Sequence, residues 1–207
     1  MASAIVAPAV ETRAERRRRA TEARLLDAAL EVFCTRGYDA ATTAEMARAA
    51  DVAAGTFYLH FRDKRAAYDR LARHTAHDLL ERWRGAMRPG MPVADRVGLA
   101  LRLAADFWRA DLRRARLLLE GGPSFGSEGH LRFVDEIAAA FAASGARGRR
   151  PLSTRALALV VAGLGIELGR LVVADPGADT DELVRLVRRA FVTRPETPVS
   201  GRSRTRA

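Results

Sequence analysis

With 207 residues, of which 48% are hydrophobic and 29% charged, the chain has the composition of a soluble globular protein of one domain or two small ones. A net charge of +10 favours a polyanionic partner, either nucleic acid or an anionic membrane surface. One cysteine, Cys34, excludes an internal disulfide framework, and the lack of any run of 18 apolar residues argues against a membrane-spanning helix.

Helical periodicity recurs along the whole chain and strand alternation is scarce, so we predict an all-α fold of about nine helices. The apolar residues 1–10 lack a preceding basic region, so we expect a disordered start and no secretion signal. The first helix should cover residues 15–35, with Gly37 as its stop. Cys34 lies beside its buried stripe, either as a packed small side chain or as a redox sensor.

Two short helices should follow the first. Thr42 and Glu45 fit a capping box, in which each side chain satisfies a free backbone N–H at the start of a helix. Asp51 suits the turn that links this helix to a third one over residues 53–61. Two short helices joined by a tight turn, behind a longer supporting helix, have helix-turn-helix geometry.

The third helix overlaps the stretch of residues 55–68, which holds four aromatic side chains although aromatic residues make up only 6% of the chain. On a helical wheel Phe57 and Phe61 share one face, which should pack inward. The outward hydroxyl and imidazole groups suit DNA, and Leu59 suits a thymine methyl group. Lys64, the only lysine, falls in the first turn of the next helix, where a phosphate is also favoured. The alternative is an amphipathic helix with a solvated margin.

The stretch "TTAEMARAADVAAGTFYLHFRDKRAAY", residues 42–68, resembles the DNA-binding signature of the TetR (tetracycline-repressor) family of bacterial regulators. The resemblance covers residues 25–68. It implies a cytoplasmic homodimer that binds a palindromic DNA operator and is neither an enzyme nor a cofactor or metal protein. The positions that the resemblance and the wheel assign to DNA are Thr42, Thr43, Ala54, Gly55, Thr56, Tyr58, Leu59, His60 and Lys64.

The sequence departs from the family pattern at the turn and at the start of the third helix. Asp51 stands where glycine is usual, which is tolerable because aspartate visits the left-handed region more easily than most residues. Ala53 and Ala54 stand where a serine and a polar or basic residue are common, so this chain lacks a cap and two DNA-binding side chains there. Either the arginines of residues 13–19 compensate by binding DNA, or they form a solvated charge run.

The resemblance and the composition together imply four segments. They are a basic, disordered arm (1–19), a helix-turn-helix DNA-binding domain (20–66), a ligand-binding and dimerisation domain (67–193) and a disordered basic tail (194–207).

The resemblance implies that the last two helices, over residues 153–174 and 180–193, pair across a two-fold axis. The chain is uncharged from Ala156 to Ile166 and apolar nearly all round, as in a helix buried on every side. Gly163, Gly165 and Gly169 permit close helix approach. The expected interface residues are Leu164, Leu168, Leu183, Leu186, Val187 and Phe191. The alternative is an intramolecular core without a dimer.

The resemblance also implies a small, mostly apolar ligand. Residues with the right character to line its cavity, each of which can equally be core packing, are Trp83, Met87, Phe107, Trp108, Phe125 and Phe133. Glu167, the one acid in the long apolar helix, either pairs with Arg170 or faces the cavity.

Two other classes of protein compete with this interpretation. A metalloenzyme is suggested by His74 and His77, with Asp78 and Glu81 nearby, but the other histidines are distant or already assigned. A basic protein at a membrane surface fits the arginine runs but leaves the aromatic cluster unexplained. We therefore expect a repressor that a ligand releases, with an activator or a regulator without an inducer as the alternative.

Overall fold

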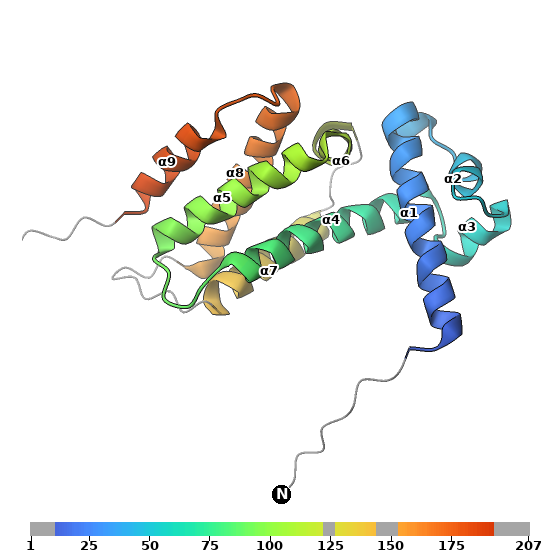
Figure 1. Cartoon of the computed structure of the whole chain (residues 1–207), viewed down its shortest axis with the longest axis horizontal. Helices are drawn as coiled ribbons and strands as arrows, with labels where there is room; N and C mark the ends of the chain where they lie inside the picture. The colour runs from blue at the N-terminus through green and yellow to red at the C-terminus, as the bar shows by residue number, and fades with distance from the viewer. Residues whose placement is uncertain (1–10, 122–126, 144–152, 193–207) are drawn as a thin grey trace, which may run out of the picture.

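The structure is a computed structural model and describes residues 11–121, 127–143 and 153–192. In these ranges it is helical throughout and contains no strand, which confirms the predicted all-α class (Figure 1). The helices are α1 (Arg13–Ala40), α2 (Thr43–Ala49), α3 (Ala54–His60), α4 (Lys64–Ala86), α5 (Val93–Ala110), α6 (Leu112–Arg116), α7 (Ser127–Ala143), α8 (Thr154–Ala174) and α9 (Thr180–Ala190). A π-helical turn, Leu117–Gly121, follows α6.

Helix α1 begins earlier than expected. Thr12 caps it, because its hydroxyl accepts from the Glu15 N–H while the Glu15 carboxylate accepts from the Thr12 N–H at 2.7 Å. The prediction of a disordered arm is therefore wrong from residue 13 onward. Residues 1–10 and the predicted tail (194–207) lie outside the described residues. At its other end the helical path is interrupted at Gly37, whose φ of 78° favours glycine, as the expected stop required.

Two hydrophobic clusters divide the molecule along α4. The first packs α1, α2 and α3 around Leu25, Phe33 and Met46, and α4 contributes Tyr68 and Leu71 to it. The second packs α4, α5, α7 and α8 around a larger core. In Figure 1, α4 leaves the α1–α3 group and runs beneath α5, α8 and α9. Helix α4 thus belongs to both cores. The π-helical turn also joins them, because Leu117 is buried in the first cluster and Leu119 packs against the second.

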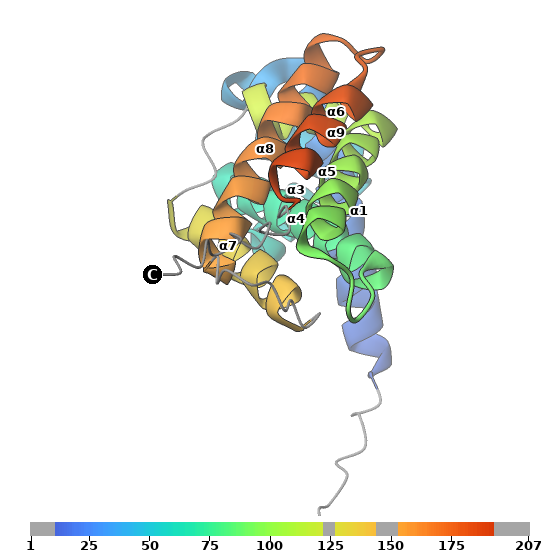
Figure 2. The same ribbon diagram turned by 90° about the vertical axis from the view of Figure 1, so that its left-hand side faces the viewer.

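In the second cluster α5 packs against both α8 and α9, while α7 packs on α8 and α4 (Figure 2). Gly169 of α8 makes the close approach that its sequence suggests. A Cβ atom there would lie 2.6 Å from a Leu119 methyl carbon and 2.8 Å from the Trp108 ring. Gly163, by contrast, faces open space. Gly169 therefore permits a close helix approach within the subunit, whereas Gly163 does not.

Polar contacts hold α9 and the preceding loop on α5. Arg188 of α9 binds Asp95 of α5 through two nitrogens, at 2.6 and 2.8 Å. Arg109 donates to the Ala178 carbonyl at 2.8 Å and to the Thr180 hydroxyl at 2.9 Å. These bonds fix the position of α9 on α5 and so determine which of its side chains face the solvent.

Helix α8 is long and apolar enough to cross a membrane by length and composition alone, but half of that window is buried inside the fold. A core helix meets the same criterion, and α8 packs against α5 and α7.

Candidate DNA-binding surface and regulatory core

The turn between α2 and α3 has the geometry that the sequence indicates. Asp51 has a φ of 52°, in the left-handed region where the resemblance expects a glycine. The Val52 N–H donates to the Ala47 carbonyl at 3.0 Å, and the Val52 side chain packs against the first cluster. Aspartate therefore replaces glycine at this turn without opening it.

Helix α3 is anchored by the two phenylalanines predicted to point inward. Phe57 is 0% exposed and Phe61 is 5% exposed, and their ring centroids are 5.5 Å apart. Ala53 precedes α3 without a side-chain cap, as the missing serine implied. Because α3 has only seven residues, tertiary packing must hold it.

The opposite face of α3 is open. Leu59 is 74% exposed and Tyr58 is 59% exposed, while Ala54 and Gly55 are also exposed. A Cβ atom at Gly55 would meet nothing within 4 Å, so a DNA backbone can approach closely there. Thr56 and His60 are half-buried at the margins of this face.

Hydrogen bonds fix α2 against α3. The Thr43 hydroxyl lies 2.9 Å from the Tyr58 hydroxyl. Thr42 and Glu45 form the predicted capping box, and the hydrogen bonds from Thr42 lower the pKa of the Glu45 carboxyl. The two helices thus present one surface, with Tyr58 oriented by its partner on α2.

Lys64 differs from the expectation. Its ammonium group donates to the backbone carbonyls of Tyr38, Asp39 and Ala41 at 2.9, 2.7 and 3.3 Å. It also lies over the Tyr38 ring, 4.9 Å from the centroid. Its partners in this structure therefore lie at the end of α1 and not in the solvent around α3.

The arginines at the start of α1 are helical and exposed. Arg19 pairs with Glu11 at 2.9 Å, and Arg16 donates to the Glu11 carbonyl at 2.7 Å. Arg13, Arg17 and Arg18 have no ion-pair or hydrogen-bond partner among the described residues. These three guanidinium groups are thus available to an external anion.

The aromatic residues proposed for a ligand cavity gather in the second core. Trp83, Phe107 and Trp108 are buried, and Met87 and Phe133 are partly buried and pack against the same core. Neither indole N–H has an acceptor among the described residues. Phe125 lies outside the described residues. Glu167 is exposed and pairs with Arg170 at 2.9 Å, so the prediction that it faces the cavity is wrong and the pairing alternative holds.

Several solved structures share this architecture. FadR, a fatty acid degradation regulator from Bacillus halodurans, is 22% identical with a TM-score of 0.64, over 82% of this chain and 96% of that chain. FadR from Bacillus subtilis, in complex with stearoyl-CoA, is 20% identical with a TM-score of 0.63, over 83% and 97%. A TetR-family transcription regulator from Shewanella sp. PV-4 is 19% identical with a TM-score of 0.65, over 84% and 99%.

At these identities the likenesses show the fold. The helix-turn-helix region adds a match in sequence, because residues 25–71 fit the model of the bacterial regulatory proteins of the tetR family. Residues 25–71 are a DNA-binding domain of the TetR family. A chain with this helix-turn-helix domain is a DNA-binding transcriptional regulator. No curated protein sequence matches it.

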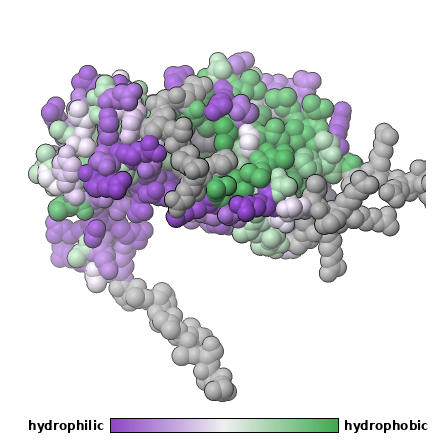
Figure 3. Space-filling view, turned by 180° about the vertical axis from the view of Figure 1, so that it is seen from behind, coloured by the Kyte–Doolittle hydropathy of each residue, from purple (hydrophilic) through white to green (hydrophobic). Residues whose placement is uncertain are grey.

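The last two helices of the chain carry exposed apolar side chains. Leu186 of α9 is 64% exposed, and Leu183 is also exposed, while Leu164, Val187 and Phe191 are partly buried. Leu168 was predicted to face a partner, but it is 6% exposed and packs in its own subunit's core, which corrects that prediction. Figure 3 shows an apolar area on the C-terminal half of the molecule, away from α1–α3.

Sequence reasoning missed two further exposed residues of α8, Leu159 and Val160. They share a helical face with Gly163, four and three positions further on, which is also exposed. The near-continuous apolar run hid them, because a helix that is apolar all round shows no preferred face.

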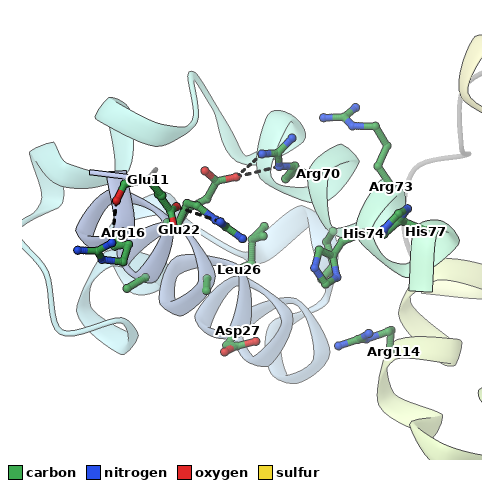
Figure 4. A pocket seen from close by; sticks show the side chains of 14 residues that line it. Glu11, Arg16, Glu22, Leu26, Asp27, Arg70, Arg73, His74, His77 and Arg114 are labelled. Carbon is green, nitrogen blue, oxygen red and sulfur yellow. Dashed lines mark hydrogen bonds and ion pairs between the residues drawn. The ribbon is translucent and has the colours of Figure 1, made fainter. Parts of the chain in front are cut away.

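A groove of about 810 Å³ lies between α1 and α4, with Arg114 of α6 at one end (Figure 4). Its lining is charged and includes none of the aromatic residues of the second core. Much of that charge is compensated, since Arg70 of α4 binds Glu22 of α1 at 2.6 Å across the groove. This pair connects the DNA-binding helices to the rest of α4.

The histidines of α4 do not belong to a group of metal ligands among the described residues. His74 pairs with Asp78 at 3.3 Å, and Arg114 lies 3.7 Å from the same carboxylate. Within the described ranges, no three His, Cys, Asp or Glu side chains come together in a way that could hold a metal ion. Burial raises the pKa of the Cys34 thiol, and its sulfur lies 3.5 Å from the Arg113 carbonyl.

Proposed function

We propose that this TetR-family regulator is a repressor that binds a pseudo-palindromic operator as a homodimer and is released by a small, mostly apolar ligand. The observation that carries the DNA-binding part is the open face of α3, held outward by the buried Phe57 and Phe61. A short helix fixed in this way fits the major groove. The protein then acts in the cytoplasm, where the chromosome is.

Base edges and phosphates are assigned to different side chains. Leu59, Gly55 and Ala54 face the bases, while Thr43, Thr56, Tyr58 and His60 donate to phosphates or base edges. Thr42 is no longer among the donors, because its hydroxyl already donates to the Glu45 carboxylate at 2.9 Å. The free guanidinium groups of Arg13, Arg17 and Arg18 add phosphate contacts from the start of α1. They compensate in part for the alanines at positions 53 and 54, whose methyl groups cannot donate a hydrogen bond to DNA.

Replacing Leu59 with glutamine should change the preferred base at one position in each half-site, because the side chain at the groove floor then reads hydrogen bonds in place of a methyl group. We expect a change of about 1–3 kcal/mol in preference at that position. Selection of binding sites from random duplexes with wild type and variant measures it. Tyr58→Phe is the matched control, since it should weaken binding to every sequence without changing the preferred bases.

The outward faces of α8 and α9 support the homodimer. Leu183 and Leu186 leave large apolar side chains in solvent, while Leu164, Val187 and Phe191 lie beside them partly buried. In a two-fold symmetric dimer, this surface of one subunit is buried against the same surface of the other subunit. It also places two α3 helices on two half-sites about one helical turn apart.

The second core supports the ligand. Trp83, Phe107 and Trp108 form its apolar wall with Met87 and Phe133, and the two indole N–H groups lack acceptors among the described residues. A ligand with a long apolar part and one polar acceptor satisfies both features. FadR from Bacillus subtilis, a structural relative, was solved with stearoyl-CoA, so acyl chains are the first compounds to test.

Helix α4 supplies a route from this core to the DNA surface. It contributes Tyr68 to the DNA-binding cluster and Trp83 to the ligand core. The Phe107 and Trp108 ring centroids are 5.3 Å apart, so a ligand that enters between these rings must separate them and favour another position of α4. Movement of α4 changes the spacing of the two α3 helices in the dimer.

We expect operator DNA and the ligand to weaken each other's binding by the same factor, about 5–150-fold, because coupling between two sites is reciprocal. Trp83 and Trp108 are the only tryptophans, so their fluorescence reports binding in the core directly. Stearoyl-CoA and shorter acyl-CoA thioesters are titrated with and without operator. A compound that binds equally tightly in both titrations is not the inducer, since equal affinity for two forms shifts neither.

A further inference from the structure

The only lysine of the protein is fully occupied by hydrogen bonds to the backbone. An ammonium group has three N–H donors, and Lys64 directs its group at three carbonyl oxygens, at 2.7 to 3.3 Å. The positive charge also lies 4.9 Å from the centroid of the Tyr38 ring. To reach a DNA phosphate, the side chain would have to give up at least one of these contacts.

The three acceptors lie where the backbone needs a donor. Tyr38, Asp39 and Ala41 follow Gly37, at which the helical path of α1 breaks off. Carbonyls at the end of a helix lack intrahelical partners and carry partial negative charge. A cation placed there stabilises them, as lysine and arginine side chains commonly do at helix C-termini.

We propose that Lys64 is a positioning residue for DNA binding and makes no phosphate contact: it holds the segment between α1 and α2 on the start of α4. Residue Ala41, one of its acceptors, directly precedes the capping residue Thr42 of α2. Helix α2 in turn orients Tyr58 through the Thr43 hydroxyl. Lys64 therefore fixes the position and orientation of α2 relative to α4.

This position gives Lys64 a part in regulation, an extension that rests on the proposed ligand response. Because α4 extends from Lys64 to the ligand core at Trp83, a shift of α4 pulls directly on the start of α2. The reading helices then move with α4 and not independently of it. The hydrogen bonds from Lys64 to the backbone carbonyls lie outside the ligand core. The link between α4 and α2 is therefore the same for any ligand that moves α4.

The first test uses the wild-type protein and its single lysine. Acetic anhydride modifies Lys64 and the α-amino group, which mass spectrometry of peptides separates. We expect acetylation of Lys64 to be at least about tenfold slower in the folded protein than in urea at the same pH, because three hydrogen bonds hold the amine. Equal rates in folded and unfolded protein would overturn the proposal. This result does not depend on DNA binding.

The second test compares Lys64→Met with Lys64→Arg over a series of salt concentrations. Removal of a phosphate contact lowers the slope of log K against log salt by about 0.9 per subunit, or about 1.8 for a dimer. We expect both variants to bind operator roughly tenfold more weakly with the wild-type slope, because a planar guanidinium cannot direct three donors at converging carbonyls. A phosphate contact predicts instead that arginine restores binding and that methionine reduces the slope.

Arg88→Met is the matched control, since it removes an exposed charge from the α4–α5 connection and should change neither affinity nor slope. Lys64→Met with a reduced slope, or Lys64→Arg with wild-type affinity, contradicts the proposal. If the wild type fails to bind duplex DNA specifically, the proposed repressor function fails, while the acetylation rates still decide the role of Lys64. If a variant does not fold, those rates again give the answer.

Discussion

Replacing Leu186 with glutamate should convert the dimer to a folded monomer. The side chain is 64% exposed on α9, outside both hydrophobic clusters, so the subunit loses no core packing. In a two-fold interface the substitution occurs twice, and each copy buries an unpaired carboxylate. We expect the dimer dissociation constant to rise by roughly a hundredfold or more, as for a central interface residue.

Analytical ultracentrifugation at micromolar concentration measures this change, and thermal unfolding followed by circular dichroism checks that the monomer is folded. Operator binding should fall with dimerisation, because a single α3 reads only one half-site. Leu59→Glu is the matched control: the same substitution on the exposed face of α3 should abolish DNA binding and leave the dimer intact. A wild-type monomer, or a Leu186→Glu dimer of unchanged affinity, would contradict the proposed interface.

Replacing Phe57 with alanine should unfold the DNA-binding region while the second core remains folded. Phe57 is fully buried in the cluster that α1, α2 and α3 share, and removing an aromatic ring from a core costs about 3–5 kcal/mol. Helix α3 has seven residues and no side-chain cap, so it has little stability apart from this packing. Specific DNA binding should disappear.

The two tryptophans make this prediction measurable, because both belong to the second core. In urea, the circular dichroism of Phe57→Ala should start to fall at lower denaturant than the tryptophan fluorescence. Tyr58→Ala is the control, since removing this exposed side chain leaves no buried cavity and should weaken DNA binding without separating the two transitions. Coincident transitions in Phe57→Ala would show that the two clusters unfold together.

The packing also explains why the two clusters respond to each other. Arg113 of α6 binds Glu31 of α1 at 2.9 Å, and Arg70 of α4 binds Glu22 of α1 at 2.6 Å. These ion pairs are largely exposed, so each contributes little to stability. Their geometry nevertheless allows α1 to follow α4 and α6, as a ligand-driven change in the second core requires.

The sequence by itself determined the local features of the DNA-binding surface. The capping box at Thr42 and Glu45, the left-handed turn at Asp51 and the inward side chains of Phe57 and Phe61 all follow from neighbours within a few positions. Such features depend on backbone geometry and helical period, which are the same in any surrounding fold. The same reasoning located the breaks at Gly37 and before Asp63.

Only the tertiary structure decided the partners of residues that reach beyond their own helix. Lys64 finds carbonyls 23 to 26 positions away, and Arg96, placed on α5, is fully buried and donates to the Phe141 carbonyl on α7. Leu168 lies inside the subunit, whereas Leu159 and Val160 of the same helix lie outside. Helical period shows which residues share a face, but the elements that cover that face come from distant parts of the chain. Their position is set by the packing of the whole core, which no local pattern encodes.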